Sequence, residues 1–298
     1  MHLIAKSNLY GFGYDSIKFI IKYIKGIVVK DLEELDKVRK LKISIKTIIL
    51  FEKNKEKLTY FCMNKIGDNE KKSTKKTYIR VDPFLGMHGI SLDELKKIQN
   101  LKDYYGILIY LNECLTENEE MELQKIIKIA KDNNLLLNIG GSKILDYLYK
   151  LKGYDKIEIR LLRRILFSDD NKSTMFLRSR LINSLNVNKK FNIGFKSDRK
   201  TFYDGYLYLV SFGYNDLKIL PLLYKNNIPL KIGKSYYDIA CYPCMNTTWL
   251  YSKTKKNLED VFDVFREYHE ILKACEILDI DIDEFYTSFN TEIKRIYK

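Results

Sequence analysis

Short apolar runs alternate with amphipathic stretches along most of the chain, and this alternation constrains the fold more than any other feature. The runs at residues 2–6, 106–111 and 135–139 have the length of buried strands. Segments with helical spacing, such as residues 117–132, lie between them. Strands that alternate with helices are typical of parallel α/β folds. With about seven or eight such units, the sequence predicts a TIM-like β/α barrel, regular or distorted.

The pattern changes after Pro229, where residues 230–232 have the composition of a last strand. We therefore predict a barrel domain over residues 1–232 and a second region over residues 233–298. In that region an irregular segment precedes two C-terminal helices, at residues 258–278 and 282–296, that pack on the barrel. Within the barrel domain, residues 174–187 and 204–212 are predicted to be helical.

Composition excludes several classes of protein. The 298 residues are 46% hydrophobic and 31% charged, which argues against disordered and fibrous proteins. No apolar run approaches the roughly 20 residues that span a bilayer, and the N-terminus lacks the features of a signal peptide. Five cysteines do not form a disulfide framework. We expect an intracellular protein without a membrane partner.

The positive charge is concentrated in one part of the chain. Lys and Arg number 52 against 39 Asp and Glu, a net charge of +13. Residues 143–200 contain 15 basic and 6 acidic side chains, a net of +9, and the other 240 residues have only +4. The codon bias of an AT-rich genome would spread lysine evenly, so the clustering favours a local anion-binding surface.

The basic residues of this segment follow predicted strands. Arg163 and Arg164 come just after the strand at residues 156–161, and Lys196, Arg199 and Lys200 end the strand at 191–195. In β/α units, residues that follow strands emerge at one rim. Arginine grips phosphate with two parallel hydrogen bonds, and lysine adds a point charge. These residues therefore predict a phosphate-binding rim, with a merely solvated rim as the alternative.

Other motifs suggest less specific chemistry. The histidines are His2, His88 and His269, too scattered for a multi-histidine metal site, so a resident metal is not expected. His88 could bind a single metal or be an ordinary loop histidine. The pair Cys241-x-x-Cys244 could bind zinc with Cys275 or His269, act in redox chemistry, or hold two half-buried thiols. The segments Gly140-Gly141-Ser142 and Gly11-Phe12-Gly13 could hold phosphate or be turns.

Two stretches resemble the thirty-kilodalton protein subunit of ribonuclease P. Residues 13–17, Gly-Tyr-Asp-Ser-Ile, followed by the segments 31–41 and 43–52, are similar to the opening of that family. Residues 157–166, Ile-Glu-Ile-Arg-Leu-Leu-Arg-Arg-Ile-Leu, resemble its I-E-I-x-x-R-x-L-L segment, and Arg178 and Arg180 lie where its next helix has arginine. Residues 193–198 and 202–214 are similar to the elements that follow. The match covers residues 10–60 and 135–225.

The resemblance implies a barrel related to the polymerase-and-histidinol-phosphatase hydrolases but without their metal histidines. It implies a non-catalytic RNA-binding subunit, without a cofactor, that supports removal of tRNA 5′ leaders. Its partners would be the ribonuclease P RNA, precursor tRNA and other subunits, in the nucleus of a eukaryote or the cytoplasm of an archaeon. The implied RNA contacts are Arg160, Arg163, Arg164, Arg178, Arg180, Lys196, Ser197, Arg199 and Lys200.

Two other functions fit the same residues. One is a barrel hydrolase that acts on a phosphorylated small molecule, with Asp82, His88 and Asp198 as acid–base or metal groups. The other is a protein-binding scaffold with no anionic partner.

Overall fold

The chain divides into two compact units. The computed structural model describes residues 1–50, 59–63, 77–82, 89–111, 115–141, 144–147, 151, 154–161, 173, 175–188, 191–194, 199–200 and 204–297. The first unit comprises Met1–Leu9 and Tyr14–Leu166, and the second comprises Tyr10–Gly13 and Phe167–Lys298. The main division therefore lies near residue 166, not at residue 232 as the sequence suggested.

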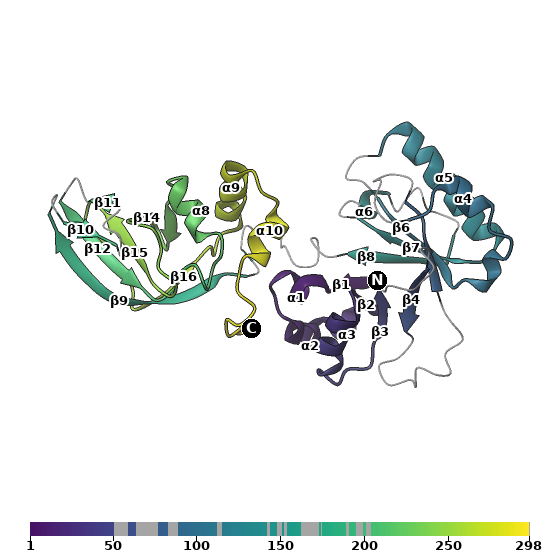
Figure 1. The fold of residues 1–298 in the computed structure, drawn as a ribbon, viewed down its shortest axis with the longest axis horizontal. Coiled ribbons are helices and arrows are strands. Elements are labelled where there is room, and N and C mark those ends of the chain that lie inside the picture. The colour runs from purple at the N-terminus through teal and green to yellow at the C-terminus, as the bar shows by residue number, and fades with distance from the viewer. Residues whose placement is uncertain are drawn as a thin grey trace. The chain divides into compact units, whose positions relative to one another are not determined.

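The first unit is a closed barrel whose strands run in the order β1 to β8 (Figure 1). Neighbouring strands pair in parallel, including β8 with β1, except that β4 runs antiparallel to both β3 and β5. The strands are β1 (His2–Ile4), β2 (Gly26–Val29), β3 (Lys46–Ile49), β4 (Thr59–Met63), β5 (Thr77–Arg80), β6 (Gly106–Tyr110), β7 (Leu136–Gly140) and β8 (Ile157–Leu161). The predicted TIM-like α/β barrel is confirmed.

Helices and short turns connect these strands. They are α1 (Lys6–Tyr10), η1 (Tyr14–Ser16), α2 (Ile17–Ile20), η2 (Ile21–Tyr23), α3 (Leu32–Arg39), α4 (Leu92–Lys96), η3 (Leu101–Asp103), α5 (Glu117–Asp132) and α6 (Ile144–Tyr147). Ser91 and Thr116 each begin a helix with a capping box, in which the side chain accepts from the backbone of the glutamate three residues later. Local sequence thus defines where α4 and α5 start.

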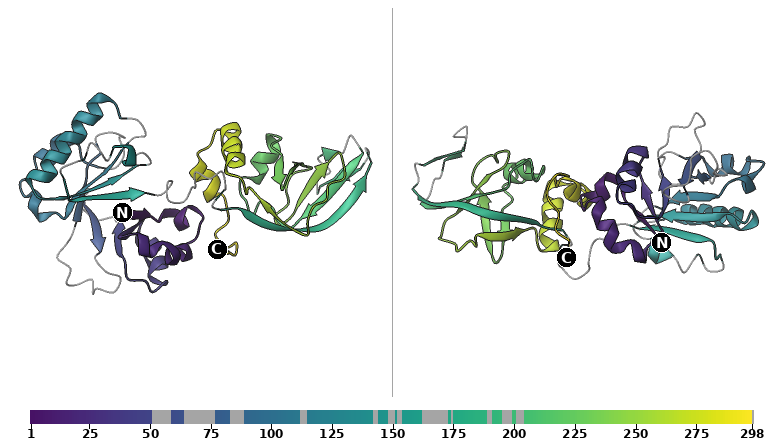
Figure 2. Two further views of the ribbon diagram at one scale, coloured as in Figure 1. Left: turned by 180° about the vertical axis from the view of Figure 1, so that it is seen from behind. Right: turned by 90° about the horizontal axis from the view of Figure 1, so that it is seen from below.

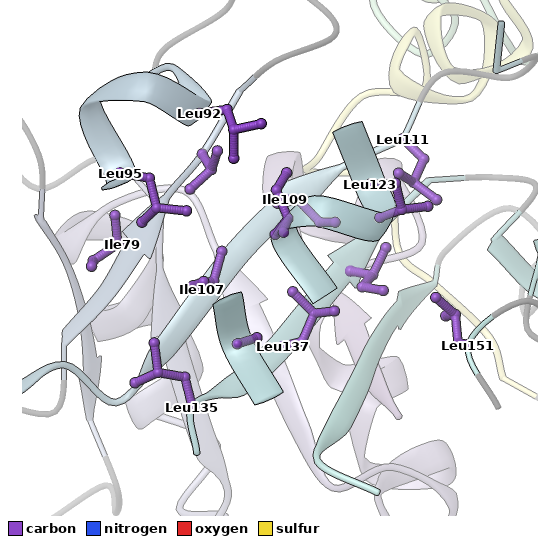
Figure 3. Packing of buried hydrophobic residues seen from close by; sticks show 14 of the residues in the cluster. Ile79, Leu92, Leu95, Ile107, Ile109, Leu111, Leu123, Leu135, Leu137 and Leu151 are labelled. Carbon is purple, nitrogen blue, oxygen red and sulfur yellow. The ribbon is translucent and has the colours of Figure 1, made fainter. Parts of the chain in front are cut away.

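An extensive core cluster of this barrel lies between its strands and its helices. Alternate strand residues such as Ile107, Ile109 and Leu137 face Leu95 of α4 and Leu123 of α5, and all are almost completely buried (Figure 3). The intervening strand residues point into the barrel, where Val28, Ile48, Leu50, Tyr78 and Leu108 form a smaller cluster. The chemistry available inside the barrel therefore depends on the inward-facing strand residues.

The second unit is a closed barrel of antiparallel strands in the order β12-β15-β14-β13-β16-β9 (Figures 1 and 2). Its strands are β9 (Leu177–Val187), β12 (Gly205–Val210), β13 (Leu230–Ile232), β14 (Ser235–Ile239), β15 (Thr248–Ser252) and β16 (Val261–Val264), with a separate pair formed by β10 (Asn192–Ile193) and β11 (Arg199–Lys200). Its helices are α8 (Leu220–Lys225), α9 (Tyr268–Leu278) and α10 (Ile282–Thr287).

Several sequence predictions for this unit are wrong. Residues 177–187 and 205–210 are strands, not helices, and the segment expected to be irregular contains β14 and β15. The last strand at Leu230–Ile232 is confirmed, as are two helices near the C-terminus, although β16 occupies part of the first predicted helix. Within the described ranges, no helix combines the length and apolar character that crossing a bilayer requires.

Candidate functional site

Lys6 is the first residue of interest because it follows β1 at the carboxyl end of the parallel strands. In β/α barrels, active sites lie at this end, built from the residues that follow the strands. Lys6 is half-buried, and it continues the alternation in which His2 and Ile4 face the barrel interior. A lysine amine at such a place can attack a carbonyl carbon and form a covalent bond with it.

The backbone directly after Lys6 is strained. Ser7, Asn8, Leu9 and Tyr10 have φ of 52°, 56°, 53° and 50°, so α1 is a left-handed turn made without glycine. Each such residue costs about 1–2 kcal/mol because its Cβ approaches the following carbonyl oxygen. Strain of this kind persists only where the surroundings fix it, and it is concentrated at functional sites.

Arg160 lies inside the same barrel, on the strand that pairs with β1. It is only 3% exposed. Its guanidinium donates to the backbone oxygen of Asn138 at 3.1 Å, to the side-chain Oδ1 of Asn138, and to the backbone oxygen of Ile109 at 2.7 Å. Burial, followed by the charge of the nearby Arg80, lowers the pKa of Arg160 to about 9, so the group is still a cation at neutral pH.

Gly140 makes room for that guanidinium. A Cβ added at Gly140 would lie 2.6 Å from Nη2 of Arg160, so a larger residue would displace it. The next residue, Gly141, has a φ of +143°, which also favours glycine. Gly140, the last residue of β7, therefore has a packing role next to Arg160, whereas a Cβ at Gly141 would lie 2.9 Å from the backbone oxygen of Leu111.

A buried polar network lies beneath Arg160, toward the amino end of the strands. Glu158 Oε1 accepts from Lys46 Nζ at 2.9 Å, and Glu158 Oε2 accepts from the Tyr78 hydroxyl at 2.8 Å and from Asn138 Nδ2 at 3.1 Å. Burial works to raise the pKa of the Glu158 carboxyl, but His2 when protonated and the Lys46 ammonium hold that pKa below its ordinary value. Asn138 thus links an ionised carboxylate to the guanidinium of Arg160.

His2 completes this network as a neutral base. Asn138 Nδ2 lies 3.2 Å from Nδ1 of His2 and donates to it, which leaves the proton on Nε2, 3.5 Å from Glu158 Oε1. His2 is fully buried, and this burial lowers its pKa to about 4, aided by the charges of Lys46, the N-terminus and Arg160 and opposed by Glu158.

The low pKa of His2 predicts a loss of stability in mild acid. Between pH 6.5 and 4 the unfolded chain takes up a proton at His2 that the folded chain does not, so the free energy of unfolding should fall with pH by about 3 kcal/mol in this window. Denaturant unfolding at several pH values measures this. The His2→Gln variant should lose most of the slope between pH 6.5 and 4, and an unchanged slope would contradict the assignment. The depressed pKa of Glu158 adds a further loss of stability as the pH falls below the ordinary glutamate value of 4.5.

Of the nine residues predicted to contact RNA, those that the structure describes belong to two different units. Arg160 is buried in the first barrel, whereas Arg178 and Arg180 lie on β9 of the second unit. Arg178 donates through Nε and Nη2 to the carboxylate of Asp263 at 2.8 and 3.1 Å. Arg199 and Lys200 form β11, and Arg163, Arg164, Lys196 and Ser197 lie outside the described residues.

The remaining motifs have mostly structural explanations. A Cβ at Gly11 would lie 2.3 Å from the backbone oxygen of Tyr286, so close approach explains this glycine. Among the described residues, Glu267, His269 and Glu270 are the one group of potential metal ligands that converge. Lys231 Nζ already lies 2.6 Å from Glu267 and 3.4 Å from Glu270, so an ion pair explains that cluster.

The other predicted acid–base and metal groups do not assemble in the described structure. Cys241 is buried and Cys244 half-buried, and neither joins the converging group of potential ligands. Asp82 follows β5, and His88 and Asp198 lie outside the described residues. Sequence reasoning missed Lys6, for which the available signal was a lysine directly after a buried strand and shortly before Gly11-x-Gly13.

Comparison with solved structures identifies the fold. The chain is similar to alanine racemase from E. faecalis over 100% of its length and 91% of that chain, with a TM-score of 0.75 and 16% identity. It is similar to alanine racemase from D-cycloserine-producing Streptomyces lavendulae, over 100% of this chain and 90% of that chain, with a TM-score of 0.76 and 13% identity. It is also similar to the alanine racemase from Bacillus anthracis with bound L-Ala-P. The match covers 97% of this chain and 86% of that chain, with a TM-score of 0.73 and 14% identity. No family model and no curated protein matches the sequence.

This similarity corrects the functional predictions. The resemblance to the ribonuclease P subunit is wrong, because the whole chain has the two-barrel fold of alanine racemases. The assignments as a non-catalytic, RNA-binding subunit in tRNA processing are corrected with it, since the matched proteins are enzymes of another class. Nothing in the structure or the comparisons supports an RNA partner.

Proposed function

We propose that this chain is a pyridoxal phosphate-dependent enzyme of the amino acid racemase type, in which Lys6 holds the cofactor. The observation that carries the proposal is the place of Lys6, at the carboxyl end of β1 and next to the strand that bears buried Arg160. The full-length similarity to alanine racemases supports it.

The residues at this end of the barrel fit the cofactor chemically. Enzymes that use pyridoxal phosphate combine a lysine, bonded to the cofactor aldehyde, with an aspartate or arginine that faces the pyridine nitrogen. Lys6 and Arg160 supply this pair from neighbouring strands. Loops after the seventh and eighth strands of such barrels often bind phosphate, and Gly140 ends β7 with Gly141 directly after it. When bound, the cofactor would supply an electron sink that stabilises a carbanion at the substrate Cα.

The side chains also favour an anionic substrate. Arg80, on β5, is only 7% exposed, and its positive charge lowers the pKa of Arg160. The barrel therefore holds two buried guanidinium groups that act on each other electrostatically. Guanidinium groups bind carboxylate well, and an α-amino acid presents a carboxylate. Lys6 would anchor the cofactor and exchange a proton with the substrate, whereas Arg160 would donate a hydrogen bond and keep its charge.

Cofactor binding and racemisation together test this function. Titration of the purified chain with pyridoxal phosphate should produce a visible absorbance band. Incubation of the loaded chain with single enantiomers of small amino acids in deuterium oxide should yield the opposite enantiomer, with deuterium at Cα. Absence of cofactor binding would contradict the proposal, and cofactor binding without exchange at Cα would contradict the racemase type.

A further inference from the structure

A buried glutamate side chain accepts a hydrogen bond from the backbone next to Lys6. Glu34, on α3, is only 8% exposed. Its Oε1 accepts a hydrogen bond from the backbone N–H of Ser7 at 2.6 Å, and its Oε2 accepts one from the backbone N–H of Lys30 at 2.7 Å. The Glu34 carboxylate therefore links, through hydrogen bonds, the backbone segment that follows β1 with the backbone segment that follows β2.

The position of Lys6 is fixed on both sides. Ala5, the residue before it, donates through its backbone N–H to the oxygen of Val28 on β2 at 2.7 Å. Ser7, the residue after it, donates to Glu34 and is the first residue of the left-handed turn. A strained turn persists only where its surroundings support it, and the Glu34 carboxylate contacts this turn at Ser7, the second residue of α1.

Tyr14 and Asn8 extend this support. Asn8 N–H donates to the Tyr14 hydroxyl at 3.3 Å, and Tyr14 N–H donates to Oδ1 of Asn8 at 3.2 Å. Burial, followed by the charge of Glu34 and a hydrogen bond to it, raises the pKa of Tyr14 well above its ordinary value. The phenol is therefore protonated over the ordinary pH range and can donate to the Glu34 carboxylate.

We propose that Glu34 is a positioning residue for Lys6, because its buried carboxylate holds the left-handed turn from which the lysine side chain extends. This inference rests on the proposed function. A covalent anchor on a long, flexible side chain needs a fixed Cα if the bound group is to keep one orientation. Glu34 does not touch the reacting atoms in this account and acts through the backbone of Ser7.

A matched pair of variants tests the role. Glu34→Gln keeps the size of the side chain but replaces one acceptor oxygen with an amino group that opposes a backbone N–H. Glu33→Gln makes the same change one residue earlier, where the side chain is 78% exposed and pairs with Lys37 across one helical turn. We expect Glu34→Gln to weaken pyridoxal phosphate binding about tenfold and to slow the appearance of its absorbance band, since charge-assisted hydrogen bonds are lost. Glu33→Gln should match the wild type.

Further readouts separate the possible outcomes. Hydrogen exchange of the peptide that contains Ser7 should speed up in Glu34→Gln, and circular dichroism shows whether that variant is folded. If Glu34→Gln does not fold, the Tyr14→Phe variant tests the positioning role instead. We expect Tyr14→Phe to lose about threefold in affinity for pyridoxal phosphate and to show faster hydrogen exchange at Ser7. The positioning role is overturned if the folded variant, Glu34→Gln or otherwise Tyr14→Phe, binds pyridoxal phosphate as tightly as the wild type does. Failure of the wild type to bind pyridoxal phosphate refutes the proposed function instead.

Discussion

Replacement of Lys6 by alanine should abolish covalent attachment of the cofactor and remove most of the racemase activity. Without the amine no covalent bond to the cofactor forms, and the group that exchanges a proton with the substrate is lost. We expect racemase activity to fall by on the order of 10³-fold, the scale on which a positioned proton-transfer group contributes. Chiral chromatography of the amino acid measures this, and the visible absorbance band should be absent.

Lys30→Ala is the matched control for that change. Lys30 follows β2 as Lys6 follows β1, but its side chain is 57% exposed and lies 3.4 Å from Asp31. The hydrogen bond of Lys30 to Glu34 comes from its backbone N–H, which the substitution keeps. The absorbance band and activity should therefore survive in Lys30→Ala. Equal losses in the two variants would show that Lys6 has no special role.

Replacement of Arg160 by alanine should produce the second large effect, on both stability and cofactor binding. It leaves the oxygens of Asn138 and Ile109 without their buried donor and opens a cavity over Gly140. We expect the free energy of unfolding to fall by about 3 kcal/mol, because unsatisfied buried acceptors cost about 1–3 kcal/mol each and removal of a buried charge offsets part of this. Denaturant unfolding measures the loss.

Arg160→Lys separates charge from geometry. Lysine keeps the cation but cannot reproduce the planar fork that serves Asn138 and Ile109 together. This variant should be more stable than Arg160→Ala and still bind pyridoxal phosphate more weakly than the wild type does. A variant with wild-type cofactor affinity would show that the guanidinium does not face the cofactor.

The first barrel was largely predictable because its signals are local. Buried runs such as residues 106–110 and 136–140 are long enough to be strands, and the capping boxes at Ser91 and Thr116 define helix starts. The reversed direction of β4 was not predictable, since strand direction depends on pairing between distant segments.

The second barrel was missed because its strands are stabilised by antiparallel partners far along the chain. Residues 177–187 were interpreted as a helix although Leu177 and Ser179 are buried and Arg178 and Arg180 exposed, which is the period of a strand. Their partners are residues of β12 and β16, which local periodicity does not reveal. The charge cluster in residues 143–200 includes residues of both units.

The burial of Arg160 was missed for a related reason. Glu158 and Arg160 belong to the segment that resembled ribonuclease P, yet both face the interior of the barrel, because residues two apart on a strand share a face. Lys6 was missed because lysine is abundant in a chain with 52 basic residues. Only the barrel register places Lys6 beside the strand of Arg160.

The central claim is that Lys6 bonds covalently to pyridoxal phosphate, and reductive trapping tests it most directly. The chain is incubated with pyridoxal phosphate, the bond is reduced with borohydride, and the peptides are analysed by mass spectrometry. A stoichiometric phosphopyridoxyl modification is expected on Lys6 and should be absent from Lys6→Ala. A modification spread over surface lysines, or located on another single lysine, would contradict it.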